Sequence, residues 1–200
     1  MVELTSARKN IARHITRPVV QLLAKTPLTP DILTWFGFLI AVAAAVMVAS
    51  EHLFAAGFVV LFGGFFDMLD GALARLTNRT TRFGAVLDST LDRLSEAVVL
   101  IGILVFYAGE QSFAGTLVVG LAWAGSLLVS YIRARAEAIG LDCQRGLFTR
   151  PERVVVLTLG LLLSQFNNAL LIAMAVIAVM SFFTAGQRLY HVWRQLKKAT

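Results

Sequence analysis

Long apolar stretches alternate with short polar breaks along most of the chain. The stretches fall at about residues 32–50, 53–75, 84–108, 112–135, 152–166 and 168–190. An α-helix rises about 1.5 Å per residue, so most of these stretches are long enough to cross a hydrocarbon layer about 30 Å thick. The fifth stretch is the shortest. The pattern predicts an all-α integral membrane protein with six transmembrane helices.

The first 28 residues follow a different pattern. Between residues 3 and 24, apolar side chains recur near the helical period and alternate with basic residues. This arrangement is typical of an amphipathic helix that lies in the membrane interface, and Pro18 would kink it. We therefore expect an N-terminal juxtamembrane helix within residues 1–28 and a six-helix membrane domain over residues 29–200.

Composition and charge agree with a membrane location. Apolar residues make up 58% of the chain and charged residues 15%, whereas a soluble domain is about a quarter charged. If the N-terminus lies on one side of the membrane, all 18 Lys and Arg residues fall on or near that side. The positive-inside rule then predicts a cell-membrane protein whose termini and loops 76–83 and 139–151 are cytoplasmic. The net charge of +6 favours anionic lipid headgroups as partners and argues against nucleic acid, because no separate basic module exists.

Four aspartates lie at the predicted cytoplasmic ends of the second and third stretches. Asp67 and Asp70 are three residues apart and Asp88 and Asp92 are four apart, so each pair shares one helical face. A short loop joins the two stretches, so the carboxylates can converge. Left without counter-charge, they would repel one another at a depth where a charge costs several kcal/mol.

Three arrangements would relieve this repulsion. The carboxylates can face water, pair with Arg75, Arg82 or Arg93, or bind divalent cations, which prefer hard oxygen ligands. The clustering of four short acids beside small residues favours the cations, and a pair of metal ions suits in-line phosphoryl displacement. A divalent-cation transporter is an alternative. It would need polar groups across the whole membrane, and the outer halves of the stretches lack ionisable residues.

The aspartates also belong to a longer motif. The chain carries D-x-x-D-G-x-x-A-R, eight further residues, and then G-x-x-x-D-x-x-x-D. This motif resembles the signature of the CDP-alcohol phosphatidyltransferase family. The specified positions are Asp67, Asp70, Gly71, Ala74, Arg75, Gly84, Asp88 and Asp92. The resemblance implies six membrane helices, a homodimer, and Mg²⁺ or Mn²⁺ as cofactor with two ions per active site.

The resemblance also implies roles for individual residues. Asp67, Asp70 and Asp88 would hold one ion. Asp67, Asp88 and Asp92 would help hold the second, and Asp92 would be the catalytic base. The residues implied for binding the donor, CDP-diacylglycerol, are Pro30, Asp31, Ile32, Leu33, Thr34, Gly71, Ala74, Arg75, Thr81 and Gly84.

Several basic residues of the second half lie on the same predicted side of the membrane. Taken singly they can be anchors that reach the headgroups, but together they can converge on one anion. The segments that carry these residues are Ser130–Glu137, Arg150–Arg153 and Gln187–Arg188. They resemble the corresponding segments of bacterial phosphatidylinositol phosphate synthases, whose acceptor is 1D-myo-inositol 3-phosphate. The phosphate of that acceptor would meet Ser130, Arg133, Arg153 and Arg188. In the proteins that these segments resemble, lysine is common at the position of Arg133. The alternative is phosphatidylglycerophosphate synthase, which uses glycerol 3-phosphate.

The charge distribution makes a topological prediction. Reporter tags at Met1, Gly140 and Thr200 should all locate to the cytoplasm, and a tag at Gly109 should locate outside, because the Lys and Arg residues flank only the first three positions. A split among the first three tags would contradict the six-span arrangement.

Overall fold

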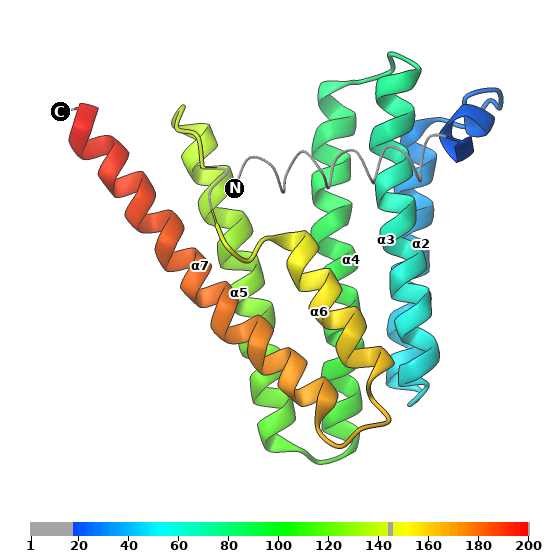
Figure 1. Cartoon of the computed structure of the whole chain (residues 1–200), viewed down its shortest axis with the longest axis vertical. Helices are drawn as coiled ribbons and strands as arrows, with labels where there is room; N and C mark the ends of the chain where they lie inside the picture. Colours follow the sequence, from blue (N-terminus) through cyan, green and yellow to red (C-terminus); the bar gives the residue numbers. More distant parts are fainter. Residues whose placement is uncertain (1–17, 144–145, 200) are drawn as a thin grey trace. The chain divides into compact units, whose positions relative to one another are not determined.

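The chain is helical in the part that the computed structural model describes, residues 18–143 and 146–199, and that part contains no strand. A short helical segment at residues 18–23 precedes six longer helices (Figure 1). These are α2 (Pro30–Ala49), α3 (Leu53–Leu76), α4 (Arg82–Gly109), α5 (Phe113–Ala138), α6 (Arg150–Leu162) and α7 (Ala169–Ala199). Each coincides with a predicted apolar stretch to within a few residues, except that α7 continues to residue 199. Most of the predicted juxtamembrane helix lies outside the described residues.

Four tight turns separate most of these helices. Each contains one residue in the left-handed backbone region: Glu51, Asn78, Gln111 or Asn168. After α2, α3 and α4 such a residue reverses the chain and lets the last carbonyls find donors, whereas Asn168 lies immediately before α7. The turns therefore coincide with polar breaks that the sequence predicts.

Four of the helices, namely α2, α3, α5 and α7, are long and apolar enough to cross a membrane. The helix α4 has 28 residues, but its first fifteen include Asp88, Asp92, Arg93 and Glu96, which lower its hydropathy. The helix α6 has only 13 residues and would rise about 20 Å. The prediction of an all-helical chain is thus confirmed over the described residues, and four of its helices are candidate membrane spans.

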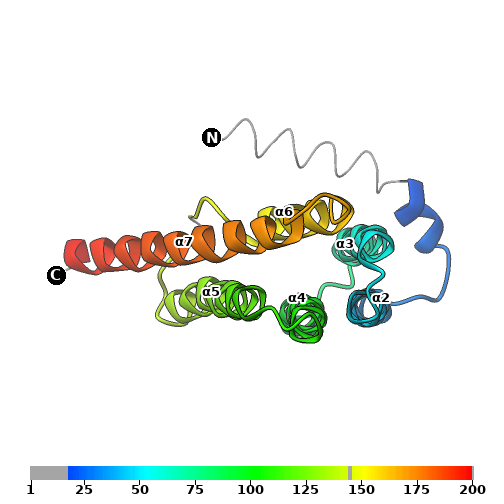
Figure 2. The ribbon, with the colours of Figure 1, turned by 90° about the horizontal axis from the view of Figure 1, so that it is seen from below.

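Two compact units make up the chain. The first comprises residues 18–43 and 59–98 of the described part, and the second comprises residues 44–58 and 99–199 apart from 144–145. In the first unit, α2 and α3 lie side by side (Figure 2). The buried residues Val20, Leu33, Leu69 and Leu73 form its apolar core. This core joins the segment before α2 to both helices, beside the aspartates of α3.

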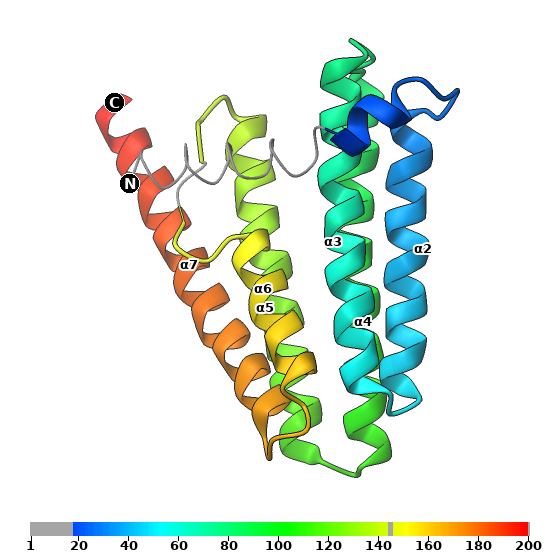
Figure 3. The same cartoon turned by 45° about the vertical axis from the view of Figure 1, so that its right-hand side comes forward.

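The second unit is built on α7, which packs along both α5 and α6 (Figure 3). Small residues allow these approaches. A Cβ atom at Gly160 of α6 would lie 2.5 Å from the Cβ of Ala173, and one at Gly125 of α5 would lie 2.9 Å from the Cβ of Ser181. Close backbone contact of this kind is common between membrane helices. Lipid provides no hydrophobic driving force there, so the helices associate through van der Waals packing at small residues.

One glycine of the second unit offers a test of this packing. A Cβ at Gly102 would lie 2.6 Å from the carbonyl oxygen of Ala45, and backbone atoms cannot move aside as a side chain can. We expect Gly102→Ala to destabilise the protein by about 1–3 kcal/mol in thermal unfolding in detergent. Gly120→Ala is the control, because no atom lies within 4 Å of its added methyl group. Equal stability of the two variants would contradict the packing.

Candidate metal and substrate site

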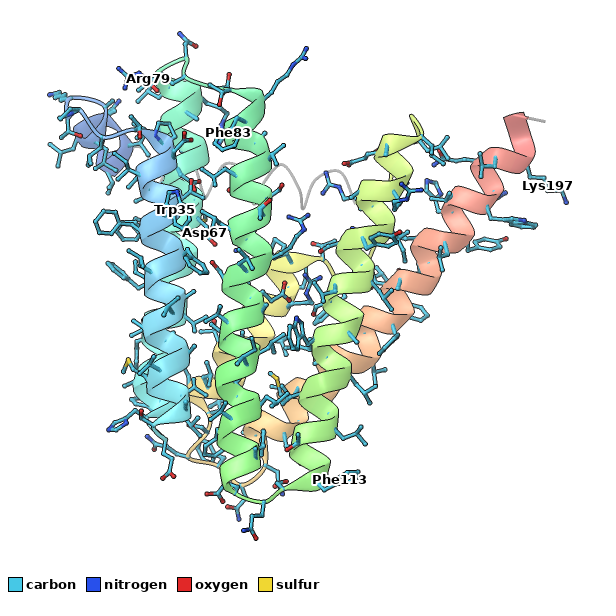
Figure 4. The ribbon with its side chains drawn as sticks, turned by 180° about the vertical axis from the view of Figure 1, so that it is seen from behind. Trp35, Asp67, Arg79, Phe83, Phe113 and Lys197 are labelled. Carbon is cyan, nitrogen blue, oxygen red and sulfur yellow. The ribbon has the colours of Figure 1, made fainter. Side chains whose placement is uncertain are left out.

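The four motif aspartates all belong to the first unit. Asp67 and Asp70 occupy one face of α3, and Asp88 and Asp92 occupy consecutive turns of α4. Asp70 is only 3% exposed, and the other three are partly buried. In Figure 4, Asp67 is seen between the ribbons of α2 and α4. The fold therefore holds these acids partly or fully away from solvent.

Asp70 has the clearest electrostatic environment. Its Oδ1 accepts a hydrogen bond from the backbone N–H of Gly71 at 2.5 Å, and the Thr34 side chain of α2 also stabilises its charge. The negative charges of Asp67 and Asp88 both act against it. Its Oδ2 is buried without a hydrogen-bond partner among the described residues. A buried carboxylate oxygen in this position is energetically costly unless it contacts a cation or accepts a hydrogen bond.

These observations fit a divalent cation in charge and chemistry. Carboxylate oxygens are the ligands that Mg²⁺ and Mn²⁺ prefer, and a cation would offset the repulsion among Asp67, Asp70 and Asp88. As the side chains stand, no three acidic, histidine or cysteine residues in 18–143 and 146–199 are grouped closely enough to hold one ion. Binding therefore requires some of these carboxylates to turn toward a common point.

Three of the residues predicted to bind the donor come together where α2 and α4 begin. The Thr81 hydroxyl accepts a hydrogen bond from the backbone N–H of Gly84 at 2.8 Å. A Cβ at Gly84 would lie 3.3 Å from Asp31 Oδ1 and 2.9 Å from Thr81 Oγ1. The glycine thus lets Asp31 and Thr81 approach the first turn of α4, the positive end of the helix dipole, which favours anionic ligands.

The remaining predicted donor residues differ in their surroundings. The Arg75 guanidinium folds back over Gly71, 3.4 Å from the position that a Cβ there would take. Leu33 is buried in the apolar core and Ile32 is 40% exposed. Thr34 is 6% exposed, and its hydroxyl donates to the carbonyl of Pro30 at 3.1 Å. Ala74 is partly buried, one turn after Asp70.

The residues predicted to bind the acceptor all belong to the second unit. Arg153 of α6 is 2% exposed and Arg188 of α7 is 3% exposed, which argues against both as headgroup anchors. The positive charges of Arg133 and Arg153 both act on Arg188, so two further guanidiniums lie close enough to repel that of Arg188. Arginines buried at membrane depth mark functional sites, because their desolvation is costly.

Two of these arginines have defined partners. Arg188 Nη1 donates to the carbonyl oxygen of Val129 at 2.5 Å, which ties α7 to α5. Arg133 Nε donates to Glu137 Oε1 at 2.8 Å, one turn later on the same exposed face of α5. Ser130 lies one turn before Arg133 and is partly buried. Glu137 was not predicted as a site residue, although its spacing of four residues from Arg133 is a visible signal.

The loop between α5 and α6 closes over the same end of α7. The N–H groups of Phe148 and Leu147 donate to Thr184 Oγ1 at 3.2 Å and Gln187 Oε1 at 3.3 Å. Gly146 has φ +154°, and a Cβ there would lie 3.3 Å from Arg188 Nε. Neither Thr184 nor Gly146 carries a signal in the sequence, because their contacts join α7 to a loop distant in sequence.

Cys143 lies in this loop and is fully buried. Burial raises the pKa of its thiol, and the positive charge of Arg188 acts in the opposite direction. The thiol therefore stays protonated at neutral pH and takes no obvious part in the site.

The comparisons with known proteins place the chain in one class. The sequence pattern of CDP-alcohol phosphatidyltransferases matches residues 27–186, so the chain belongs to that family. It is 38% identical over 200 residues to the archaetidylinositol phosphate synthase of Methanothermobacter thermautotrophicus, covering 98% of this chain and all of that one. It is 41% identical to the phosphatidylinositol phosphate synthase of Mycobacterium marinum, covering 90% of this chain and 80% of that one.

Solved structures agree with this class. The crystal structure of the Mycobacterium tuberculosis phosphatidylinositol phosphate synthase with CDP-DAG bound has a TM-score of 0.83 and 40% identity, covering 90% of this chain and 94% of that one. The structure of that enzyme in complex with manganese and citrate has a TM-score of 0.82 and 39% identity, covering 89% and 88%.

The carboxylate cluster predicts a measurable response to metal. Mn²⁺ at a hundred times its dissociation constant should stabilise the purified protein by about 2.7 kcal/mol in thermal unfolding, and EDTA should remove this gain. Asp67→Ala and Asp88→Ala should abolish most of the gain. Glu110→Gln, at an exposed acid outside the cluster, should keep it. Equal stabilisation of the two Asp variants and the wild type would contradict a metal site here.

Proposed function

We propose that this chain transfers the phosphatidyl group of CDP-diacylglycerol to an inositol phosphate. The acceptor is 1D-myo-inositol 3-phosphate, and the products are phosphatidylinositol phosphate and CMP. Support comes from the family membership and from relatives that are named for the same reaction or for its archaetidyl counterpart.

The observation that carries this proposal is the burial of Arg153 and Arg188 in the second unit, where the positive charges of Arg133 and Arg153 both act on Arg188. Such a group of arginines needs an anion, and a phosphomonoester brings close to two negative charges at neutral pH. Guanidinium forks form charge-assisted hydrogen bonds with phosphate oxygens, so Arg153 and Arg188 would bind the acceptor phosphate while Ser130 and Arg133 complete the site. A free polyol offers these arginines no comparable negative charge.

The chemistry is a displacement at phosphorus. An acceptor hydroxyl oxygen attacks the phosphorus that carries diacylglycerol, and the bond from that phosphorus to the oxygen of CMP breaks, so CMP leaves with the electron pair. Asp92 accepts the hydroxyl proton. Asp67, Asp70 and Asp88 with Asp92 would hold Mg²⁺ or Mn²⁺, whose charge would stabilise the pyrophosphate and the leaving group. Asp31, Gly71, Arg75, Thr81 and Gly84 would bind the donor.

The proposal also includes the number of metal ions, the membrane topology, the oligomeric state and the lipid contacts of the protein. Two ions per active site, six membrane spans, a homodimer and contact with anionic lipids would all fit a family of membrane transferases. The termini and the aspartates would face the cytoplasm of a cell membrane, where soluble inositol phosphate is available. The N-terminal amphipathic helix would lie along the same surface.

The role of Asp92 is testable by a conservative change. Asp92→Asn keeps the size of the side chain but cannot take up a proton. Donor binding should persist, while turnover in a purified-enzyme assay should fall by about 100-fold or more, the usual scale for losing a general base. Turnover near the wild-type rate would exclude Asp92 as the base.

Acceptor identity decides the proposal. Purified enzyme supplied with CDP-diacylglycerol should use 1D-myo-inositol 3-phosphate and show little activity with free inositol or glycerol 3-phosphate. Arg153→Gln and Arg188→Gln should each weaken use of the acceptor by about 1.5–3 kcal/mol, roughly ten- to a hundred-fold, with little change in the KM for the donor.

Arg194→Gln supplies the control, because Arg194 is an exposed arginine of α7, the helix that also carries Arg188. It removes the same charge and should leave both KM values near those of the wild type. If glycerol 3-phosphate or free inositol is the better acceptor of the wild type, the inositol-phosphate assignment is wrong and only the broader transferase class remains.

A further inference from the structure

The face of α2 that meets α3 is shaped around the two carboxylates of α3. Thr34 and Gly37 are three residues apart on α2, and Asp67 and Asp70 are three residues apart on α3. The Thr34 side chain acts on Asp70. The Oδ1 atom of Asp67 lies 2.8 Å from the position that a Cβ of residue 37 would take. The two helices therefore meet in a register that sets one residue of α2 against each acid.

Packing of the helices alone does not require a glycine at position 37. Apart from Asp67, the nearest atom to an added Cβ is the Cβ of Phe66 at 3.9 Å, which is an ordinary contact. Gly63 on α3 differs, because its nearest neighbour is the Cγ2 of Ile40 at 3.3 Å, an apolar contact between the same two helices. Glycine is also less favourable than alanine inside a helix. The space at Gly37 thus serves the carboxylate.

We infer that Gly37 is a positioning residue for the proposed metal site. The missing side chain leaves the space in which the Asp67 carboxylate stands. A methyl group there would be too close to the carboxylate oxygen, so the Asp67 side chain would have to rotate. Such a rotation costs the fold little, but a metal ligand must be held to within about 0.5 Å and 10–20° of its productive geometry. The inference rests on the proposed role of Asp67 in binding the cation.

Gly37→Ala and Gly63→Ala form a matched pair for the test, because both add one methyl group between α2 and α3. Mn²⁺ binding to purified protein in detergent is measured from the electron paramagnetic resonance signal of free Mn²⁺. Gly37→Ala should weaken Mn²⁺ binding about tenfold or more, the usual scale for loss of a group that orients a ligand. Gly63→Ala should stay within about twofold of the wild type.

Two further readouts separate positioning from general damage. Without metal, the melting temperature of Gly37→Ala should be no lower than that of Gly63→Ala. In the transfer assay, excess Mn²⁺ should restore most of kcat in Gly37→Ala, while the Mn²⁺ concentration for half-maximal rate rises by the same factor as the dissociation constant.

A double-mutant cycle gives the decisive comparison. In an Asp67→Ala background the contact is gone, so adding Gly37→Ala should change neither folding nor residual Mn²⁺ affinity. The inference is wrong if Gly37→Ala binds Mn²⁺ as tightly as the wild type, if Gly63→Ala loses as much affinity, or if Gly37→Ala unfolds the protein in both backgrounds. Failure of the wild type to bind Mn²⁺ would instead contradict the metal site itself, and this inference with it.

Discussion

Repulsion between like charges away from water is the constraint on which both proposed ligand sites depend, one in each unit. In the first unit, Asp67 and Asp88 act against the buried carboxylate of Asp70. In the second unit, Arg133 and Arg153 act against the buried guanidinium of Arg188. Each group is costly alone and becomes favourable when a ligand of opposite charge binds. A divalent cation would offset the charge of the acids, and the phosphate of the proposed acceptor would offset the charge of the arginines.

The fold supports these charges through backbone contacts and missing side chains. Gly37 and Gly84 leave space for Asp67 and Asp31, and the backbone N–H of Gly71 donates to Asp70. Around Arg188, the carbonyl of Val129 accepts a hydrogen bond, while Gly146 of the loop approaches the guanidinium. Such supports limit how far a charged side chain can move, which lets a small number of charged groups discriminate among ligands.

The helices and the common faces on which the aspartates lie could be predicted from sequence, because both depend on local spacing. Apolar length indicated the helices, and separations of three and four residues placed the aspartates on common faces. The end of α7 could not be predicted in the same way. Its last turns are polar, and side chains such as Gln187 and Gln195 bond the preceding loop instead of facing lipid. Hydropathy finds spans and gives no signal for a helix that continues beyond them.

The supporting residues were missed for a related reason. Gly37 matters because of Asp67 on another helix, and Thr184 matters because of a loop 36 residues earlier. Neither partner can be identified from one sequence without the tertiary fold. The sequence also left open whether the arginines were headgroup anchors, and only burial of Arg153 and Arg188 distinguishes the two interpretations.

The central claim is that the motif aspartates hold a divalent cation, and anomalous X-ray scattering tests it most directly. Crystals of the protein grown with Mn²⁺ should show anomalous density at the manganese edge within bonding distance of Asp67, Asp70 and Asp88, and the density should vanish in Asp88→Ala. Anomalous density elsewhere, or none at these carboxylates at saturating Mn²⁺, would contradict the claim.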